Sequence, residues 1–148
     1  MHFLDTNIVL RLFIAKDPDH ELIRRTIEVL ESRGEALAIC LQVLVEIWVV
    51  ATRPVQNNGL GWPTETVLEV VGAARSRFLC LLDDETTGVR WSTIVAQCAI
   101  RGKRAHDVRI AALMECHGIT RIVTLNEQDF AGLPGITVVH PRMVAGPV

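Results

Sequence analysis

The chain has 148 residues, of which 49% are hydrophobic, so it is long enough to bury one substantial core. Its formal net charge of -2 excludes a strongly basic nucleic-acid-binding protein, although an enzyme with a local basic patch remains compatible with it. The most apolar stretch, 36–51, is interrupted by Gln42 and Glu46, so no segment reaches the roughly 18 apolar residues of a membrane span.

The beginning of the chain predicts a buried strand that leads into a helix. Residues 2–4 form a short apolar run that ends at Asp5, and apolar residues then recur at helical spacing from Ile8 onward. Asp5 therefore follows the strand, and Thr6 or Asn7 is placed to cap the helix. Because ligands bind beyond the carboxyl ends of parallel strands, Asp5 has two open interpretations, a helix cap or a site residue.

The rest of the sequence predicts helices that alternate with short strands. Helices are expected over 20–33, 41–53, 64–76, 83–100 and 107–117. Strands are expected over 36–40, 77–82, 121–124 and 136–140. Thr64 is expected to cap its helix, 55–63 to form a loop and 126–130 an acidic turn. This alternation predicts an α/β fold, with a mostly parallel five-stranded sheet covered on both faces. We expect a single domain over 1–141 and a frayed C-terminal tail over 142–148.

The cysteines and histidines give no sign of a metal or disulfide site. Cys40, Cys80, Cys98 and Cys116 are isolated in apolar surroundings, which is typical of reduced thiols in a cytoplasmic protein. The five histidines show no ligand spacing, so zinc is not expected. Residues 1–20 lack the basic start and apolar centre of a secretory signal, so we expect a cytoplasmic location without a membrane anchor.

Glu46 is a charged residue inside an otherwise apolar helix. Its spacing places it with Gln42 and Arg53 on one narrow polar stripe. The stripe faces either water or the crevice that also holds Asp5, and the local pattern leaves both interpretations open.

Two further aspartates stand at helix or strand ends. Asp107 begins a helix, where free amides favour an ionised carboxylate, and Asp129 follows the strand 121–124. Either one alone is commonplace, because Asp caps helices frequently. Together with Asp5 and Glu46, however, they predict four converging carboxylates, which repel each other unless a cation neutralises them. Oxygen ligands suit Mg²⁺ or Mn²⁺, and such a cluster is typical of metal-assisted phosphodiester hydrolysis.

Several short motifs occur together in a fixed order. They are Leu4–Val9, Glu46, Asp107 with Ile110–Ala112, Ile122–Thr124, Asn126, and Asp129–Phe130. In this order and spacing the chain resembles the PIN-domain family from His2 to Pro141, and within that family the VapC-type toxins of prokaryotic toxin–antitoxin pairs. The resemblance implies a three-layer α/β/α fold, a magnesium-dependent ribonuclease acting on RNA, a homodimer, and inhibition by a small antitoxin protein.

The resemblance also assigns roles to individual residues. The catalytic and metal-binding acids are matched by Asp5, Glu46, Asp107 and Asp129. Thr6 and Thr124 match hydroxyl positions that support the site by orienting Asp5 and bound water. Many relatives have an acid where Asn126 stands. Either Asp129 alone supplies the fourth ligand, or Asn126 contributes a neutral oxygen.

Basic and aromatic residues have two or more interpretations. The basic residues near the acids are Arg11, Arg101, Lys103 and Arg104, and they either hold RNA phosphates or are solvated surface residues. Trp62 covers the core, meets the antitoxin or stacks on a base. The high hydrophobic content predicts a dimer through apolar helix surface, with 64–76 and 83–100 as candidates for that surface or for the antitoxin groove.

Three competing functions fit the pattern less well. A phosphoacceptor signalling domain needs a second acid beside Asp5 and a basic residue after a late strand, where Leu4 and Leu125 stand. A phosphatase of the haloacid dehalogenase type needs a second aspartate at the position of Asn7. A non-catalytic PIN-like interaction module would have lost acids that this chain retains. The sequence therefore favours a ribonuclease, with the toxin role as the main hypothesis.

Overall fold

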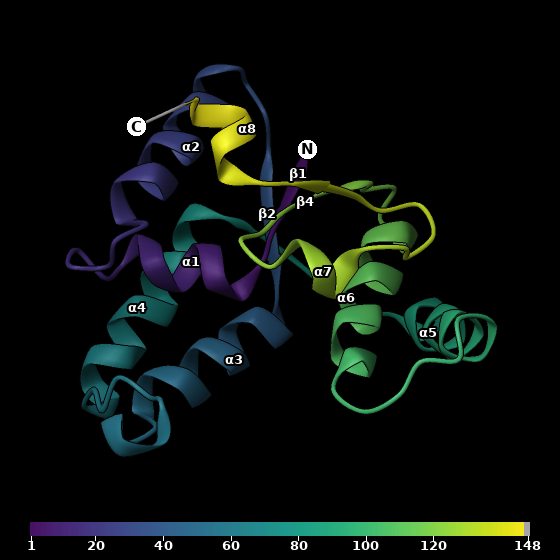
Figure 1. Cartoon of the computed structure of the whole chain (residues 1–148), viewed down its shortest axis with the longest axis horizontal. Helices are drawn as coiled ribbons and strands as arrows, with labels where there is room; N and C mark the ends of the chain where they lie inside the picture. Colours follow the sequence, from purple (N-terminus) through teal and green to yellow (C-terminus); the bar gives the residue numbers. More distant parts are fainter. Residues whose placement is uncertain (147–148) are drawn as a thin grey trace.

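A parallel sheet of five short strands organises the chain in the computed structural model, which describes residues 1–146 (Figure 1). The strands are β1 (His2–Leu4), β2 (Leu37–Cys40), β3 (Leu79–Leu81), β4 (Arg121–Val123) and β5 (Thr137–Val139). Their order is β3-β2-β1-β4-β5, and all four pairings are parallel. The chain builds the sheet outward from β1 to β3 and then returns to the other side of β1 with β4. The strand order therefore reverses beside β1, which is where open α/β sheets bind ligands.

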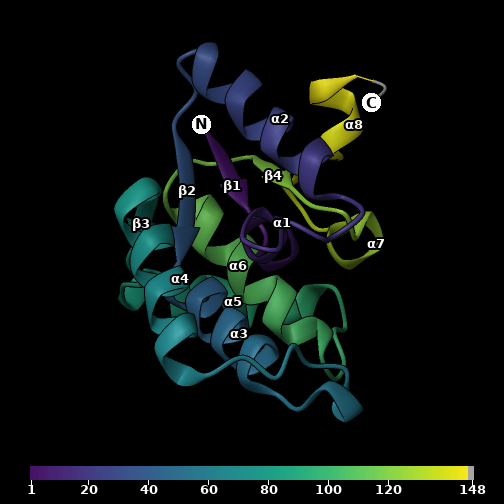
Figure 2. The ribbon, with the colours of Figure 1, turned by 90° about the vertical axis from the view of Figure 1, so that its left-hand side faces the viewer.

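Helices cover both faces of this sheet. One face carries α1 (Thr6–Leu12), α2 (His20–Ser32), α3 (Leu41–Thr52), α4 (Thr64–Arg77) and α8 (Pro141–Ala145) (Figure 2). The other face carries α5 (Glu85–Gln97) and α6 (Arg104–Cys116) (Figure 1). A short 3-10 turn (Val55–Asn57) and the small helix α7 (Glu127–Phe130) lie in the connections. The predicted three-layer α/β/α architecture is confirmed. Within residues 1–146, no helix has both the length and the apolar character needed to cross a bilayer.

Two of the three interior strands, β1 and β2, explain why the sheet needs both layers. Every residue of β1 and β2 is buried, and Phe3 and Leu4 are completely so. The outer strands are more open, since Leu79 of β3 is 52% exposed. Continuous burial of a short strand on both faces is typical of a parallel sheet between helices. The carboxyl end of β1, in the middle of the sheet, is therefore enclosed between the two helix layers.

Two predicted helix caps are wrong. The N-cap of α1 is Asp5 itself, whose carboxylate accepts a hydrogen bond from the Thr6 backbone amide, so neither Thr6 nor Asn7 has that role. Helix α4 begins directly after Pro63, and Thr64 is its first residue and makes no capping bond. The N-cap is Pro63, which has no side-chain oxygen to accept a hydrogen bond from the first helical amides.

Two other segments differ from the prediction. Pro141–Ala145 form α8, which packs on α2, and the Thr26 hydroxyl donates to the Pro141 carbonyl oxygen at 3.2 Å. The predicted fraying of the tail is therefore wrong up to Ala145, while 147–148 lie outside the described residues. Helix α6 starts at Arg104, so Asp107 lies within its first turn instead of at its head.

Candidate active site

A cleft of about 230 Å³ opens at the carboxyl edge of the sheet, where β1 and β4 end. It is lined by Asp5, Thr6, Asn7, Leu10, Arg11, Glu46, Val50, Asp107, Asn126 and Asp129. The four acids predicted from the sequence therefore meet in one place. A larger groove of about 530 Å³ lies between α5 and α6, but its walls are mostly apolar. Convergent charged groups mark the smaller cleft as the candidate site.

Asp5 is the most buried of the four acids in the cleft. The side chain follows β1 directly, and only 8% of the residue is exposed. Its Oδ1 accepts from the Thr6 amide at 2.7 Å, and its Oδ2 accepts from the Thr124 hydroxyl and the Asn7 side-chain amide, both at 2.6 Å. Both carboxylate oxygens are thus fixed by donors, which orients the group towards the cleft.

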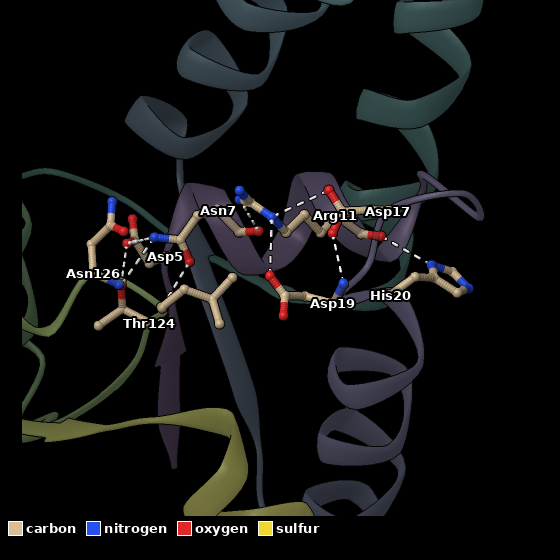
Figure 3. Close-up of polar contacts among 9 residues, drawn as sticks. Asp5, Asn7, Arg11, Asp17, Asp19, His20, Thr124 and Asn126 are labelled. Carbon is tan, nitrogen blue, oxygen red and sulfur yellow. Dashed lines mark hydrogen bonds and ion pairs between the residues drawn. The ribbon is translucent and has the colours of Figure 1, made fainter. Parts of the chain in front are cut away.

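Asn7 joins the ends of β1 and β4, a role that the sequence analysis missed. Its Nδ2 also contacts the Thr124 hydroxyl at 3.0 Å, and its Oδ1 accepts from the Leu125 amide at 3.1 Å (Figure 3). The backbone amide of Asn126 donates to the same Thr124 hydroxyl at 3.0 Å. The predicted support of Asp5 by Thr124 agrees with this geometry. A polar residue two positions after the strand-end aspartate was the available signal for Asn7.

Glu46 faces the cleft and not bulk water. The Thr6 hydroxyl donates to its Oε2 at 2.6 Å, so Thr6 supports Asp5 through its backbone and Glu46 through its side chain. Gln42, one turn earlier on α3, donates from Nε2 to Glu46 Oε1 at 2.8 Å. Of the predicted polar stripe, Gln42 and Glu46 thus belong to the site, whereas Arg53 is exposed at the end of the helix.

The acids perturb one another electrostatically. Burial is the largest cause that raises the pKa of Asp5 to about 6, and the negative charges of Glu46 and Asp129 add to it. The pKa of Asp107 is raised to about 7, again first by burial and then by the charges of Asp129, Asp5 and Glu46. Raised pKa values of carboxyl groups that share a cleft are typical of functional sites, including sites that bind a cation.

The sequence profile of the PIN domain family matches residues 2–135. The chain belongs to the PIN-domain family. This match spans the strands β1 to β4 and all four acids of the cleft, so the family and the site are found on the same residues. No curated protein sequence matches the chain.

Solved structures of toxin–antitoxin proteins share the fold of this PIN domain. A DNA-bound VapBC from Salmonella typhimurium is 26% identical with a TM-score of 0.71, covering 95% of this chain and 97% of that one. A DNA-bound VapBC2 from Rickettsia felis is 21% identical with a TM-score of 0.67, covering 94% and 97%. VapC20 from Mycobacterium tuberculosis, described as a Sarcin-Ricin loop cleaving toxin, is 18% identical with a TM-score of 0.61, covering 92% and 98%.

The donor set of the PIN-domain cleft suits a hard divalent cation. Four of its lining residues are carboxylates, and the pKa values of Asp5 and Asp107 are raised, first by burial and then by the charges of the neighbouring acids. Within residues 1–146, no three acidic, histidine or cysteine side chains surround one ion position as they stand. The chemistry of the donors fits Mg²⁺ or Mn²⁺.

The four basic residues differ in their relation to the cleft. Arg11 lines it, with Nη1 donating to the Asn7 carbonyl oxygen at 3.3 Å and Nε 3.3 Å from Asp17 Oδ2 (Figure 3). Arg104 donates to the Ala131 carbonyl oxygen at 2.6 Å. The remaining two, Arg101 and Lys103, are exposed before and at the start of α6. Arg11 is therefore the basic side chain with direct access to the site.

Proposed function

We propose that this PIN domain is a magnesium-dependent endoribonuclease and the toxin of a toxin–antitoxin pair. The observation that carries the proposal is the convergence of Asp5, Glu46, Asp107 and Asp129 on one cleft beside β1. The structural likeness to VapBC complexes and to a VapC toxin described as cleaving the Sarcin-Ricin loop supports the same function.

The four acids would hold Mg²⁺, or Mn²⁺ in its place. A bound ion supplies a water of lowered pKa as nucleophile and stabilises the oxygen that leaves the phosphorus. The chain itself contributes a prearranged ligand set. Asp5 is fixed by Asn7 and Thr124, and Glu46 is fixed by Thr6, so these carboxylates need little reordering when the ion binds.

The fourth ligand is assigned to Asp129, with Asn126 in a supporting position. Both residues line the cleft, and α7 presents them within one turn of each other. Asp129 is half-buried and contributes to the raised pKa of Asp107, whereas Asn126 is exposed and neutral. A charged oxygen binds a hard cation more strongly than an amide oxygen, so the ion favours Asp129.

RNA phosphates are assigned to the basic residues around the cleft. Arg11 lies in its wall, and Arg101, Lys103 and Arg104 lie around the start of α6, the helix that carries Asp107. Such residues would position the RNA backbone without reading its sequence.

The protein partners of the proposed toxin are a second copy of the chain and an antitoxin. Helix α3 carries Leu41, Val45 and Val49 four residues apart, and these are 59%, 51% and 45% exposed. An apolar stripe of this kind suits a symmetric helix contact between two copies. The candidates predicted from sequence, α4 and α5, also carry exposed Leu68 and Val89 and would suit the antitoxin. The expected compartment of the complex is the cytoplasm.

The experiment that tests the function is cleavage of a mixed RNA pool by the full chain. Cleavage is expected with Mg²⁺, is lost on chelation, and returns when Mg²⁺ or Mn²⁺ is added back. Undiminished cleavage in the chelator would contradict the metal assignment, and no cleavage with either ion would contradict the ribonuclease.

A further inference from the structure

Gln42 and Arg109 form a chain of hydrogen bonds that ends on Glu46. Arg109 Nη1 donates to Gln42 Oε1 at 2.7 Å, and Gln42 Nε2 donates to Glu46 Oε1 at 2.8 Å. The same Nε2 lies 3.2 Å from the carbonyl oxygen of His106. Arg109 does not line the cleft, yet it connects to one of the four acids through a single side chain.

The amide of Gln42 has one orientation that satisfies all these partners. A guanidinium only donates hydrogen bonds, so the Gln42 oxygen must face Arg109. A carboxylate and a carbonyl only accept, so the Gln42 nitrogen must face Glu46 and His106. Gln42 is only 8% exposed, and water is therefore a poor substitute for any of these contacts.

Arg109 is itself held from the other side. Its Nη2 donates to Asp83, which follows β3 and precedes α5. The network consists of the side chains of Glu46, Gln42, Arg109 and Asp83. It connects the residues that follow β2 and β3 with α6, which lies on the other face of the sheet from α3. This connection matters for Glu46 because Asp5 and Asp107 repel its charge, which favours rotation of the carboxylate into solvent unless donors hold it.

We propose that Arg109 and Gln42 are positioning residues that hold the Glu46 carboxylate in the cleft before the ion binds. With Thr6 on Oε2 and Gln42 on Oε1, each Glu46 oxygen receives one donor and keeps lone pairs for a cation. The inference deepens the proposed function, on which it rests for the role of Glu46 as a ligand.

The test compares two arginines that both connect the α5–α6 layer. Arg109→Met removes the donor to Gln42. Arg90→Met is the matched control, because Arg90 pairs with Glu115 across α5 and α6 (Nε to Oε2, 2.8 Å) away from the cleft. Gln42→Met is the second variant, which leaves the Arg109–Asp83 pair in place. Binding of Mn²⁺ to the full chain is measured by electron paramagnetic resonance, with a melting curve for each variant.

Arg109→Met and Gln42→Met are each expected to weaken Mn²⁺ binding about tenfold, as the loss of groups that orient a ligand does elsewhere. Arg90→Met should bind Mn²⁺ as the parent does. In a Glu46→Gln background, Arg109→Met should cause no further loss. The inference is overturned if Arg109→Met and Arg90→Met bind Mn²⁺ equally. It is also overturned if Arg109→Met weakens Mn²⁺ binding in the Glu46→Gln background as much as it does in the parent protein.

A second readout separates this inference from the proposed function. In the metal-free protein, the ¹³C carboxyl resonance of Glu46 should move in Arg109→Met and stay in place in Arg90→Met. A parent protein that takes up no Mn²⁺ contradicts the metal-dependent nuclease. An unmoved Glu46 resonance in Arg109→Met contradicts the positioning role, whatever the metal does.

Discussion

Asp5 and Asp84 have the same local role in two different places. Each follows a strand, has an extended backbone, and accepts a hydrogen bond from an amide of the helix that it caps, α1 or α5. Burial raises the pKa of Asp5 to about 6. The pKa of Asp84, which is exposed, is instead lowered, first by the hydrogen bond from the Thr86 hydroxyl and then by the Thr87 amide.

The difference lies in which strand each aspartate follows. Asp5 ends the central strand β1, beside the reversal of strand order, whereas Asp84 comes after the edge strand β3. Other acids converge on the first position, and solvent surrounds the second. A capping aspartate therefore becomes a candidate ligand through its place in the sheet and not through its local motif.

The largest expected contrast is in RNA cleavage. Loss of a group that orients a metal ligand costs about 10- to 100-fold in activity, so loss of the ligand itself in Asp5→Asn should exceed about a hundredfold. Asp84→Asn should cleave as the parent does, because Asn caps a helix nearly as well as Asp. The measurement is the initial rate on a mixed RNA pool with Mg²⁺. Parent-like cleavage by Asp5→Asn would remove the distinction between the two caps.

The second contrast is the sign of the pH dependence of stability. Between about pH 4 and 6 the folded protein holds a proton on Asp5 that the unfolded chain has released, so the free energy of unfolding falls as pH rises. The rise from 3.8 to about 6 corresponds to about 3 kcal/mol. The lowered pKa of Asp84 acts oppositely, since its stabilisation is present above the unfolded pKa and is lost as pH falls through the folded one.

Urea unfolding of the metal-free protein between pH 4.5 and 7.5 measures this slope. Asp5→Asn should make the slope shallower and leave the part that the raised pKa of Asp107 contributes, while Asp84→Asn should keep the parent slope. Asparagine at position 5 cannot accept hydrogen bonds on both sides, because its NH₂ would face either the Thr6 amide or the donors of Asn7 and Thr124. That mismatch costs on the order of 1–3 kcal/mol. It therefore offsets much of the stabilisation that removing the charge of Asp5 brings at pH 7. The same slope in Asp5→Asn and the parent would contradict the burial effect.

The third contrast uses, for each aspartate, one buried threonine whose hydroxyl donates to it. Thr124 is fully buried, donates to Asp5 at 2.6 Å and contacts Asn7 and Asn126, so Thr124→Val should lower cleavage by about tenfold or more and destabilise the fold by about 1–3 kcal/mol. Thr87 donates to Asp84 at 3.1 Å, so Thr87→Val should lower stability by about 1 kcal/mol with cleavage unchanged. The cleavage rates and melting curves of both variants test this prediction. Equal effects of the two substitutions on cleavage would contradict the assignment of the active site to the cleft around Asp5.

The smallest contrast concerns arginines six residues after each cap. Arg11 lines the acidic cleft, and Arg90 lines the larger groove between α5 and α6. In a catalytically inactive variant of the protein, Arg11→Gln should weaken RNA binding a few-fold. It should also reduce the salt dependence of the RNA affinity by about the amount that one phosphate contact contributes. Arg90→Gln should leave both quantities unchanged. Titrations at several salt concentrations are sufficient, and identical salt slopes for Arg11→Gln and the parent would exclude a phosphate contact.

The sequence was sufficient for the fold and for the placement of Asp5 and Asp129 at one edge of the sheet, because both follow from short-range patterns. Buried strands of three or four residues between amphipathic helices predict the parallel sheet, and parallel strands place Asp5 and Asp129 on one edge. For Glu46, helical spacing gave a polar stripe but not its direction. The direction depends on the Thr6 hydroxyl, 40 residues away in sequence.

The parts that were missed depend on contacts between distant segments. Asn7 reaches Thr124 across 117 residues, and Arg109 reaches Gln42 across 67, distances at which spacing rules carry no information. Helix α8 was missed for a different reason. His140 and Pro141 form an N-cap and a first-turn proline, but the glycine and proline of the segment pointed to a tail.

The hydrogen bond between Thr124 and Asp5 also sets an order of events during synthesis. Its two ends are 119 residues apart, and β1 lies between β2 and β4 in the finished sheet. A nascent chain that has emerged as far as α5 contains Asp5 and Glu46 but lacks Asp107, Asp129 and the strand that closes the cleft. Domains fold as units once their residues are available. The acidic cleft therefore forms late in translation, and a ribosome still making this protein carries an incomplete cleft.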